Sequence, residues 1–293
     1  MADQDFVRTE TRPIFPTHGW LGLGLVAVFW TLNWSMKGLR THWVFFPLWL
    51  GYCLTVDGLV YIRRGTSLFT RSWKKYVGLF IISAPVWWLF EVFNWRLQNW
   101  HYEGGALFTP FQFWAWATLN FTTVIPAVFG TAELIASLEF MKHLGRGLVI
   151  RPNRSTTLTF FAVGCVMLAL MLAWPRYFFP FVWISVYFIM EPVNVWLGNR
   201  SLASWTERGD WTPVIALWLG VLFTAFFWEM WNYFAYPKWV YHISWGYWFK
   251  VFEMPLLGYG GYLPFALELF AIYNLVMGWL GEKDTNYVKL APE

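Results

Sequence analysis

The chain has 293 residues, of which 58% are hydrophobic, 23% aromatic and only 13% charged. Soluble domains carry roughly 25% charged residues, so this composition excludes a water-soluble protein of ordinary surface polarity. The net charge of +4 is spread over the segments between apolar runs, which argues against a nucleic-acid partner. Cys53 and Cys165 lie within apolar runs and have no disulfide or metal-binding pattern.

Eight apolar runs have about the length that crosses the hydrocarbon core of a membrane. They cover residues 20–36, 43–62, 76–95, 111–137, 158–175, 179–197, 212–234 and 262–281. The fourth run is long and contains Pro126, so we expect it to be kinked or split. The sequence predicts an all-α fold, a polytopic transmembrane helical bundle of about eight spans, with seven or nine as alternatives.

The basic residues predict the orientation of these spans. With eight spans, both termini and the segments 63–75, 138–157 and 198–211 share one side of the membrane. That side carries fifteen of the 21 Lys and Arg residues, and the other side carries six. Basic residues are enriched on the cytoplasmic side. We therefore expect a multi-pass protein of the cell (inner) membrane with both termini in the cytoplasm.

The two halves of the chain share a pattern. Residues 88–95 (WLFEVFNW) and 226–233 (FFWEMWNY) both contain Glu-x-aromatic-Asn-aromatic, 138 residues apart. Further matched pairs, in chain order, are Trp49 with Trp183, Asp57 with Glu191, Trp100 with Trp239, Tyr102 with Tyr241 and Pro126 with Pro264. Several anchors in the same order indicate an internal duplication.

The duplication predicts the domain organisation. A repeat of four spans gives both halves the same orientation, so the predicted symmetry axis runs along the membrane normal. The expected segments are a cytoplasmic N-terminal segment (1–19), a first repeat (20–140), a basic cytoplasmic linker (141–157), a second repeat (158–281) and a cytoplasmic tail (282–293).

Two carboxyl groups in the predicted spans are candidates for chemistry, because ionisable groups in a membrane are costly unless they have a role. Glu91 with Asn94, and Glu229 with Asn232, are three residues apart and share a helix face near the outer side. A carboxyl group in a low-dielectric site favours its protonated form and can donate a proton. Aromatic faces nearby stabilise a cation. We interpret these four residues as candidate catalytic groups for acid–base chemistry on an apolar polyene.

Seven further residues are expected to line a substrate site beside these groups. They are Trp95, Trp100, Tyr102, Tyr233, Trp239, Tyr241 and Glu268. The alternative is structural, since buried Glu and Asn often only hydrogen bond to neighbouring helices. Asp57 and Glu191, near the cytoplasmic ends of their spans, fit that reading as partners of Arg63, Arg64 or Arg200.

The five histidines form no HxxxH or HxxHH cluster and no nucleotide-binding motif is present, so neither a metal nor a cofactor is expected.

The spacing of Glu91, Trp100 and Tyr102, repeated in the second half, resembles the fused lycopene cyclases. In that family each half has an acidic residue, then Trp-x-(Phe/Tyr), then a Pro followed by glutamates. Residues 263–268 (LPFALE) are similar to this last element, although only one glutamate, Glu268, is present. The resemblance implies a relative that acts on a carotenoid or another polyisoprenoid.

Three functions remain open at this point. The leading hypothesis is a membrane protein that binds or acts on a long apolar isoprenoid, in the manner of a cyclase or isomerase. Its partners would then be membrane lipid and an isoprenoid or pigment ligand. The alternatives are a structural or assembly subunit of a membrane complex, and a transporter.

Overall fold

A computed structural model describes residues 14–36, 38, 42–282 and 286–292. Its long helices are α1 (Thr17–Ser35), α2 (Phe45–Arg64), α4 (Trp73–Leu97), α5 (Pro110–Phe121), α6 (Val124–Ala136), α7 (Arg154–Ala173), α9 (Ser185–Leu197), α11 (Thr212–Tyr233) and α12 (Tyr259–Trp279). Short helices are α3 (Leu68–Arg71), α8 (Pro175–Phe178) and α10 (Ala203–Thr206), with a 3₁₀ turn at Phe179–Trp183. The predicted all-α fold is confirmed. Most of the predicted segment 1–19, and residues 283–285 and 293 of the tail, lie outside the described residues.

Six helical segments in the described part of the chain are long and apolar enough to cross a membrane. They are Phe45–Arg64, Trp73–Leu97, Pro110–Ala136, Arg154–Ala173, Thr212–Tyr233 and Leu256–Trp279. A seventh is formed if Pro175–Trp183 and Ser185–Leu197, bent by 42° against each other, make one span. The predicted run 20–36 coincides with α1, which is not among the six. These helices are compatible with a multi-pass membrane protein, and the count of eight stays a prediction.

The fourth predicted run is divided into α5 and α6. The helix breaks at Thr122 and Thr123, before Pro126. Pro126 lies in the first turn of α6, where the missing N–H of a proline costs no helical hydrogen bond. The break therefore comes just before the proline, at two threonines whose hydroxyls bond to the carbonyls of Leu119 (2.6 Å) and Asn120 (2.8 Å).

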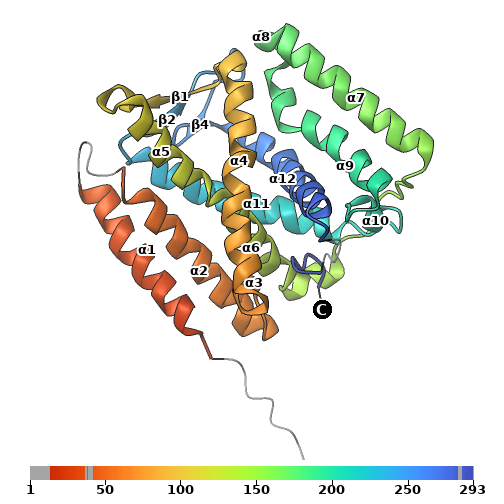
Figure 1. Cartoon of the computed structure of the whole chain (residues 1–293), viewed down its shortest axis with the longest axis horizontal. Helices are drawn as coiled ribbons and strands as arrows, with labels where there is room; N and C mark the ends of the chain where they lie inside the picture. Colours follow the sequence, from red (N-terminus) through yellow and green to blue (C-terminus); the bar gives the residue numbers. More distant parts are fainter. Residues whose placement is uncertain (1–13, 37, 39–41, 283–285, 293) are drawn as a thin grey trace, which may run out of the picture.

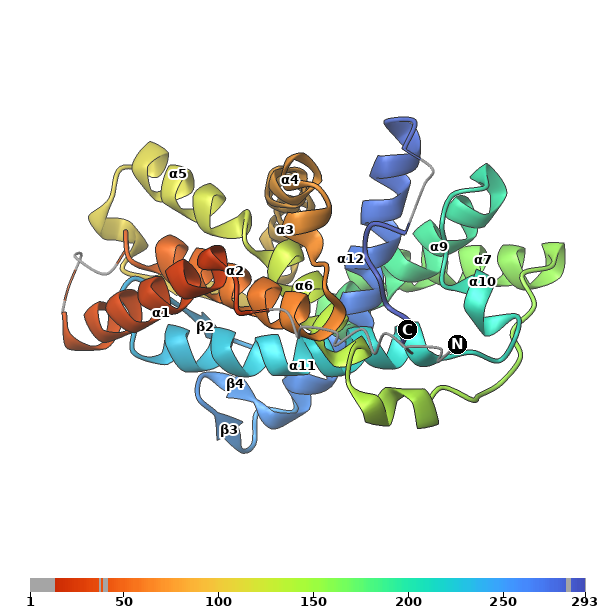
Figure 2. The same ribbon diagram turned by 90° about the horizontal axis from the view of Figure 1, so that it is seen from below.

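The helices form two flanks and a centre (Figure 1). Helices α1 and α2 pack together on one flank, and α7 and α9 on the other. Helices α4, α6, α11 and α12 lie between them, and Figure 2 shows α11 running along one face of the molecule. Only 17% of the apolar window of α7 is buried, as expected for a helix that faces lipid.

Four short strands lie at the end of the fold opposite to the C-terminus (Figure 1). β1 (Trp100–Glu103) pairs antiparallel with β2 (Lys238–Tyr241), so that the segments following α4 and α11 meet. β3 (Lys250–Val251) pairs with β4 (Met254–Pro255). This small β layer positions the aromatic residues of the candidate site.

The other end is closed by the C-terminal segment 286–292. Val288 and Leu290 are buried there. Arg64 donates to the carbonyl of Ala291 (2.9 Å), and Arg200 donates to the carbonyl of Val288 (2.8 Å). The segment thus joins residues from both halves of the chain.

Two carboxylates predicted to be equivalent make equivalent contacts. Asp57 accepts a hydrogen bond from the backbone N–H of Phe69 (3.0 Å), and Glu191 accepts one from that of Ala203 (2.8 Å). Each donor follows its carboxylate by twelve residues, and each carboxylate therefore fixes the first turn of a short helix, α3 or α10. Asp57 also lies 2.9 Å from the imidazole of His18.

Candidate functional site

The side chains of Asn94 and Asn232 hold the start of β1 and β2. Asn94 donates to the carbonyl of Trp100 (2.8 Å) and accepts from the N–H of Asn99 (2.8 Å). Asn232 likewise donates to the carbonyl of Trp239 (2.7 Å) and accepts from its N–H (2.9 Å). Both amides therefore bind the backbone that follows their helix, which fixes where the aromatic strand residues point.

Glu91 is buried at the centre of an aromatic cluster, with only 1% of its surface exposed. Its Oε1 accepts three hydrogen bonds, from the indole N–H of Trp87 (3.0 Å) and Trp100 (3.1 Å) and from the hydroxyl of Tyr102 (2.5 Å). One carboxylate oxygen thus orients three rings.

Glu229 has the corresponding place in the second half and is fully buried. Its Oε1 accepts hydrogen bonds from the hydroxyls of Tyr241 (2.7 Å) and Tyr262 (2.6 Å). The indole of Trp239 donates to the Tyr241 hydroxyl (2.9 Å) and extends this network. The second carboxyl oxygen of Glu229, Oε2, has no hydrogen-bond partner among the described residues.

The ladder of β1 and β2 brings the two clusters together. Trp100 lies opposite Tyr241, and Tyr102 lies opposite Trp239. Each strand thus places two residues of its own cluster beside two residues of the other cluster. The tryptophan of each strand lies opposite the tyrosine of the other strand. Each half therefore contributes one tryptophan and one tyrosine to the same surface.

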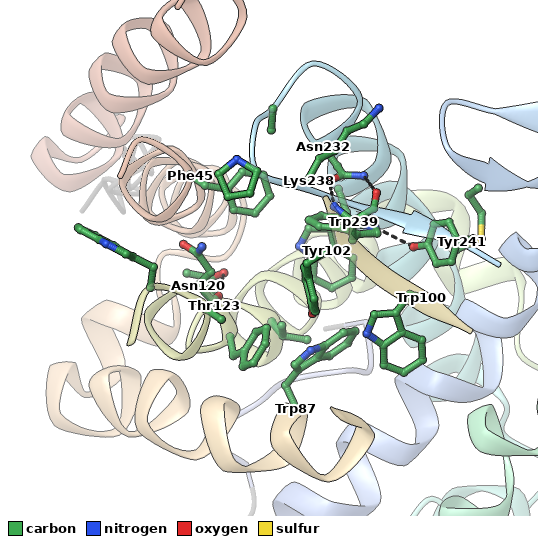
Figure 3. Close-up of a pocket in the computed structure, with 18 of the residues that line it drawn as sticks. Phe45, Trp87, Trp100, Tyr102, Asn120, Thr123, Asn232, Lys238, Trp239 and Tyr241 are labelled. Carbon is green, nitrogen blue, oxygen red and sulfur yellow. Dashed lines mark hydrogen bonds between the residues drawn. The ribbon is translucent and has the colours of Figure 1, made fainter. Parts of the chain in front are cut away.

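A cavity with a volume of about 150 Å³, partly open to the outside, lies beside this surface (Figure 3). Aromatic rings from both halves form much of its wall; they include Trp87, Trp100, Tyr102, Trp183, Trp239 and Tyr262. Trp183 stacks on Trp100 with ring centroids 5.8 Å apart. Glu91 and Glu229 are not among the lining residues, so the rings stand between the carboxylates and the space.

Four of the seven predicted lining residues, Trp100, Tyr102, Trp239 and Tyr241, line this cavity, and three do not. Trp95 is 61% exposed and Tyr233 is 42% exposed, and both lie outside the wall. Glu268 is buried elsewhere, where its Oε1 accepts the backbone N–H of Val186 (3.0 Å) in the first turn of α9. Its contact is that of a helix cap.

The two strand tyrosines keep their protons. Burial raises the pKa of Tyr102 and of Tyr241 well above the usual value for tyrosine, and the adjacent carboxylates raise it further. Both hydroxyls therefore act as hydrogen-bond donors to Glu91 and Glu229 and are poor sources of a proton for a ligand.

Several residues that line the cavity were not predicted to do so. Trp87 lies four residues before Glu91, one helical turn away, and this spacing was the available signal. Trp183 and Tyr262 come from other elements, and only the tertiary fold brings them to the wall. Five lining residues have polar side chains other than tyrosine or tryptophan: His42, Asn120, Thr123, Asn232 and Lys238.

Among the described residues, no three His, Cys, Asp or Glu side chains gather as metal ligands would. Comparisons with protein-family models, with curated proteins and with solved structures found no match to this chain. The geometry by itself is that of a partly open apolar site, with aromatic walls, few polar groups, and carboxylates that hydrogen bond to the wall residues from the side away from the cavity.

Proposed function

We propose that this multi-pass membrane protein binds a long apolar isoprenoid in the cavity between its two halves. The observation that carries the proposal is the aromatic wall of this cavity, to which both halves of the chain contribute. Ligand sites in proteins are concave and mostly apolar. Because this cavity is partly open, part of a long apolar ligand can lie against its rings while the rest extends out of it.

The duplication predicted from the sequence is part of this proposal. The equivalent contacts of Asp57 and Glu191, and of Asn94 and Asn232, support it. So does the packing of α1 on α2 and of α7 on α9. With α1 and the bent pair counted as spans, each half has four, and the loop charges favour cytoplasmic termini in a cell inner membrane.

Binding fits the site better than catalysis. Protonation of a polyene by Glu91 or Glu229 would require a carboxyl group in contact with the ligand. Both carboxyl groups lie behind rings that donate hydrogen bonds to them, and the tyrosine hydroxyls hold their own protons firmly. We therefore assign Glu91 and Glu229 to the support of the aromatic wall.

The test is expression in cells that accumulate lycopene, followed by purification in mild detergent and analysis of the bound and total isoprenoids. The wild type, Glu91→Gln and Glu229→Gln are compared. Binding predicts that lycopene copurifies with the wild type while the cellular pool keeps its composition. A cyclised product that disappears in the Gln variants would instead establish cyclase activity, and a protein free of any isoprenoid would contradict both.

A further inference from the structure

The polar groups of the cavity differ in what they already bind. The amide of Asn232 is taken up by the backbone of Trp239, and the ammonium group of Lys238 pairs with Glu253. The hydroxyl of Thr123 donates to the carbonyl of Asn120 (2.8 Å). The imidazole of His42 packs against the rings of Phe108 and Trp116, both at 5.0 Å.

Asn120 is the exception among these residues. Its Oδ1 is shielded from solvent and has no hydrogen-bond partner within the described part of the chain. Asn120 itself is one of the residues that line the cavity. A buried acceptor without a partner costs roughly 1–3 kcal/mol. Of the described side-chain atoms in this state, only Asn120 Oδ1 belongs to a residue that lines the cavity.

The backbone around Asn120 is a second indication that the ligand binds at this part of the cavity wall. Asn120 is in the last turn of α5, immediately before the break at Thr122 and Thr123. Asn120, Thr123 and Val124 all line the cavity, and in Figure 3 the labelled Asn120 and Thr123 lie together, apart from Trp87 and Trp100. Interrupted helices at membrane depth are tolerated where they line a cavity and often mark a binding site.

We propose that Asn120 binds a hydroxyl group of the ligand, so that the cavity prefers an isoprenoid alcohol to a hydrocarbon of the same length. A hydroxyl both donates and accepts hydrogen bonds, so it can satisfy an amide in either orientation. The apolar chain of the alcohol then lies along the rings of Trp87, Trp100 and Trp183. This assignment rests on the proposed function, since it names the ligand class of the same cavity.

The experiment compares two probes that differ at one end. Radiolabelled geranylgeraniol, and the hydrocarbon in which a methyl group replaces its hydroxyl, are titrated onto the full chain in lipid nanodiscs. One hydrogen bond of ordinary strength predicts that the wild type binds the alcohol about fivefold more tightly. Asn120→Leu removes this preference and keeps its affinity for the hydrocarbon.

Thr122→Val is the matched control. Thr122 lies in the same break and bonds to the carbonyl of Leu119, but it is not among the lining residues, so its variant keeps the preference for the alcohol. If Asn120→Leu gives no folded protein, Asn120→Ala removes the amide with less added bulk. Equal binding of the two probes by the wild type, or a preference that survives in the Asn120 variant, overturns the hydroxyl assignment alone. Failure of the wild type to bind either probe contradicts the cavity proposal as well.

Discussion

His101 and Val240 lie directly opposite each other in the ladder of β1 and β2, with Trp100 and Tyr241 on one side and Tyr102 and Trp239 on the other. In the sequence, Trp100 matches Trp239 and Tyr102 matches Tyr241, so His101 matches Val240. Two residues predicted to be equivalent thus face each other in the antiparallel ladder, which is the arrangement that a two-fold axis between the strands would give. The register is therefore compatible with the proposed duplication.

This register predicts a cross-link between the halves. His101→Cys with Val240→Cys, in a chain whose Cys53 and Cys165 are replaced by serine, is expected to form a disulfide under mild oxidation, because opposite residues in a ladder have neighbouring Cβ atoms. A protease site is placed at Leu148, which is 78% exposed. After cleavage, a denaturing gel separates the two halves unless a disulfide joins them. His101→Cys with Trp248→Cys serves as the control and is expected to separate. Separation of the first pair would disprove the register.

The support of the wall by Glu229 predicts a large effect on stability. Glu229→Ala leaves the hydroxyls of Tyr241 and Tyr262 without their acceptor. At roughly 1–3 kcal/mol for each unsatisfied buried group, the expected loss is several kcal/mol. Glu229→Gln keeps an acceptor oxygen and loses less. Thermal unfolding in detergent measures both, with the exposed Glu207→Ala as a control expected to change little. Equal stability of Glu229→Ala and the wild type would contradict the assigned role.

The C-terminal segment is expected to stabilise the fold. Leu290 is 1% exposed, and truncation of such a residue to alanine costs about 2–5 kcal/mol. Leu290→Ala is therefore predicted to lower the unfolding temperature clearly, whereas Leu148→Ala, at a 78% exposed position, is not. An unchanged unfolding temperature for Leu290→Ala would show that the segment does not hold the two halves together.

The proposed orientation of the protein in the membrane is tested by labelling single cysteines in intact cells. In the cysteine-free chain, Lys142→Cys lies on the predicted cytoplasmic side and Tyr247→Cys on the outer side; both positions are exposed. A maleimide that does not cross the inner membrane is expected to label position 247 and to label position 142 only after the cells are opened. The reverse pattern would invert the proposed topology.

Much of the fold could be predicted because span length and loop charge depend on local composition. The helices α2, α4, α7 and α11 coincide with predicted apolar runs for this reason. The predicted repeat also indicated four of the aromatic residues of the cavity, Trp100, Tyr102, Trp239 and Tyr241. The bend before α9 and the position of the break between α5 and α6 depend on packing and could not be predicted.

The position of Trp95 and Tyr233 outside the cavity wall has a physical reason. Trp95 and Tyr233 lie at the ends of helices that are apolar on all sides, so residue spacing does not reveal which side faces the cavity and which faces lipid. Glu268 contacts α9 over a separation of 82 residues, so no local spacing predicts this contact. Asn120 gave only a weak signal, as one polar residue in a long apolar run.

Binding of an isoprenoid in the cavity is tested most directly by filling it. Ala117 is 8% exposed and lines the cavity, whereas Ala162 lies on the exposed face of α7. Radiolabelled geranylgeraniol is titrated onto the wild type, Ala117→Phe and Ala162→Phe in nanodiscs. We predict saturable binding to the wild type, an affinity at least about tenfold weaker for Ala117→Phe because its ring occupies the ligand's space, and no change for Ala162→Phe. Equal affinity of Ala117→Phe and the wild type, or no saturable binding at all, would contradict the account.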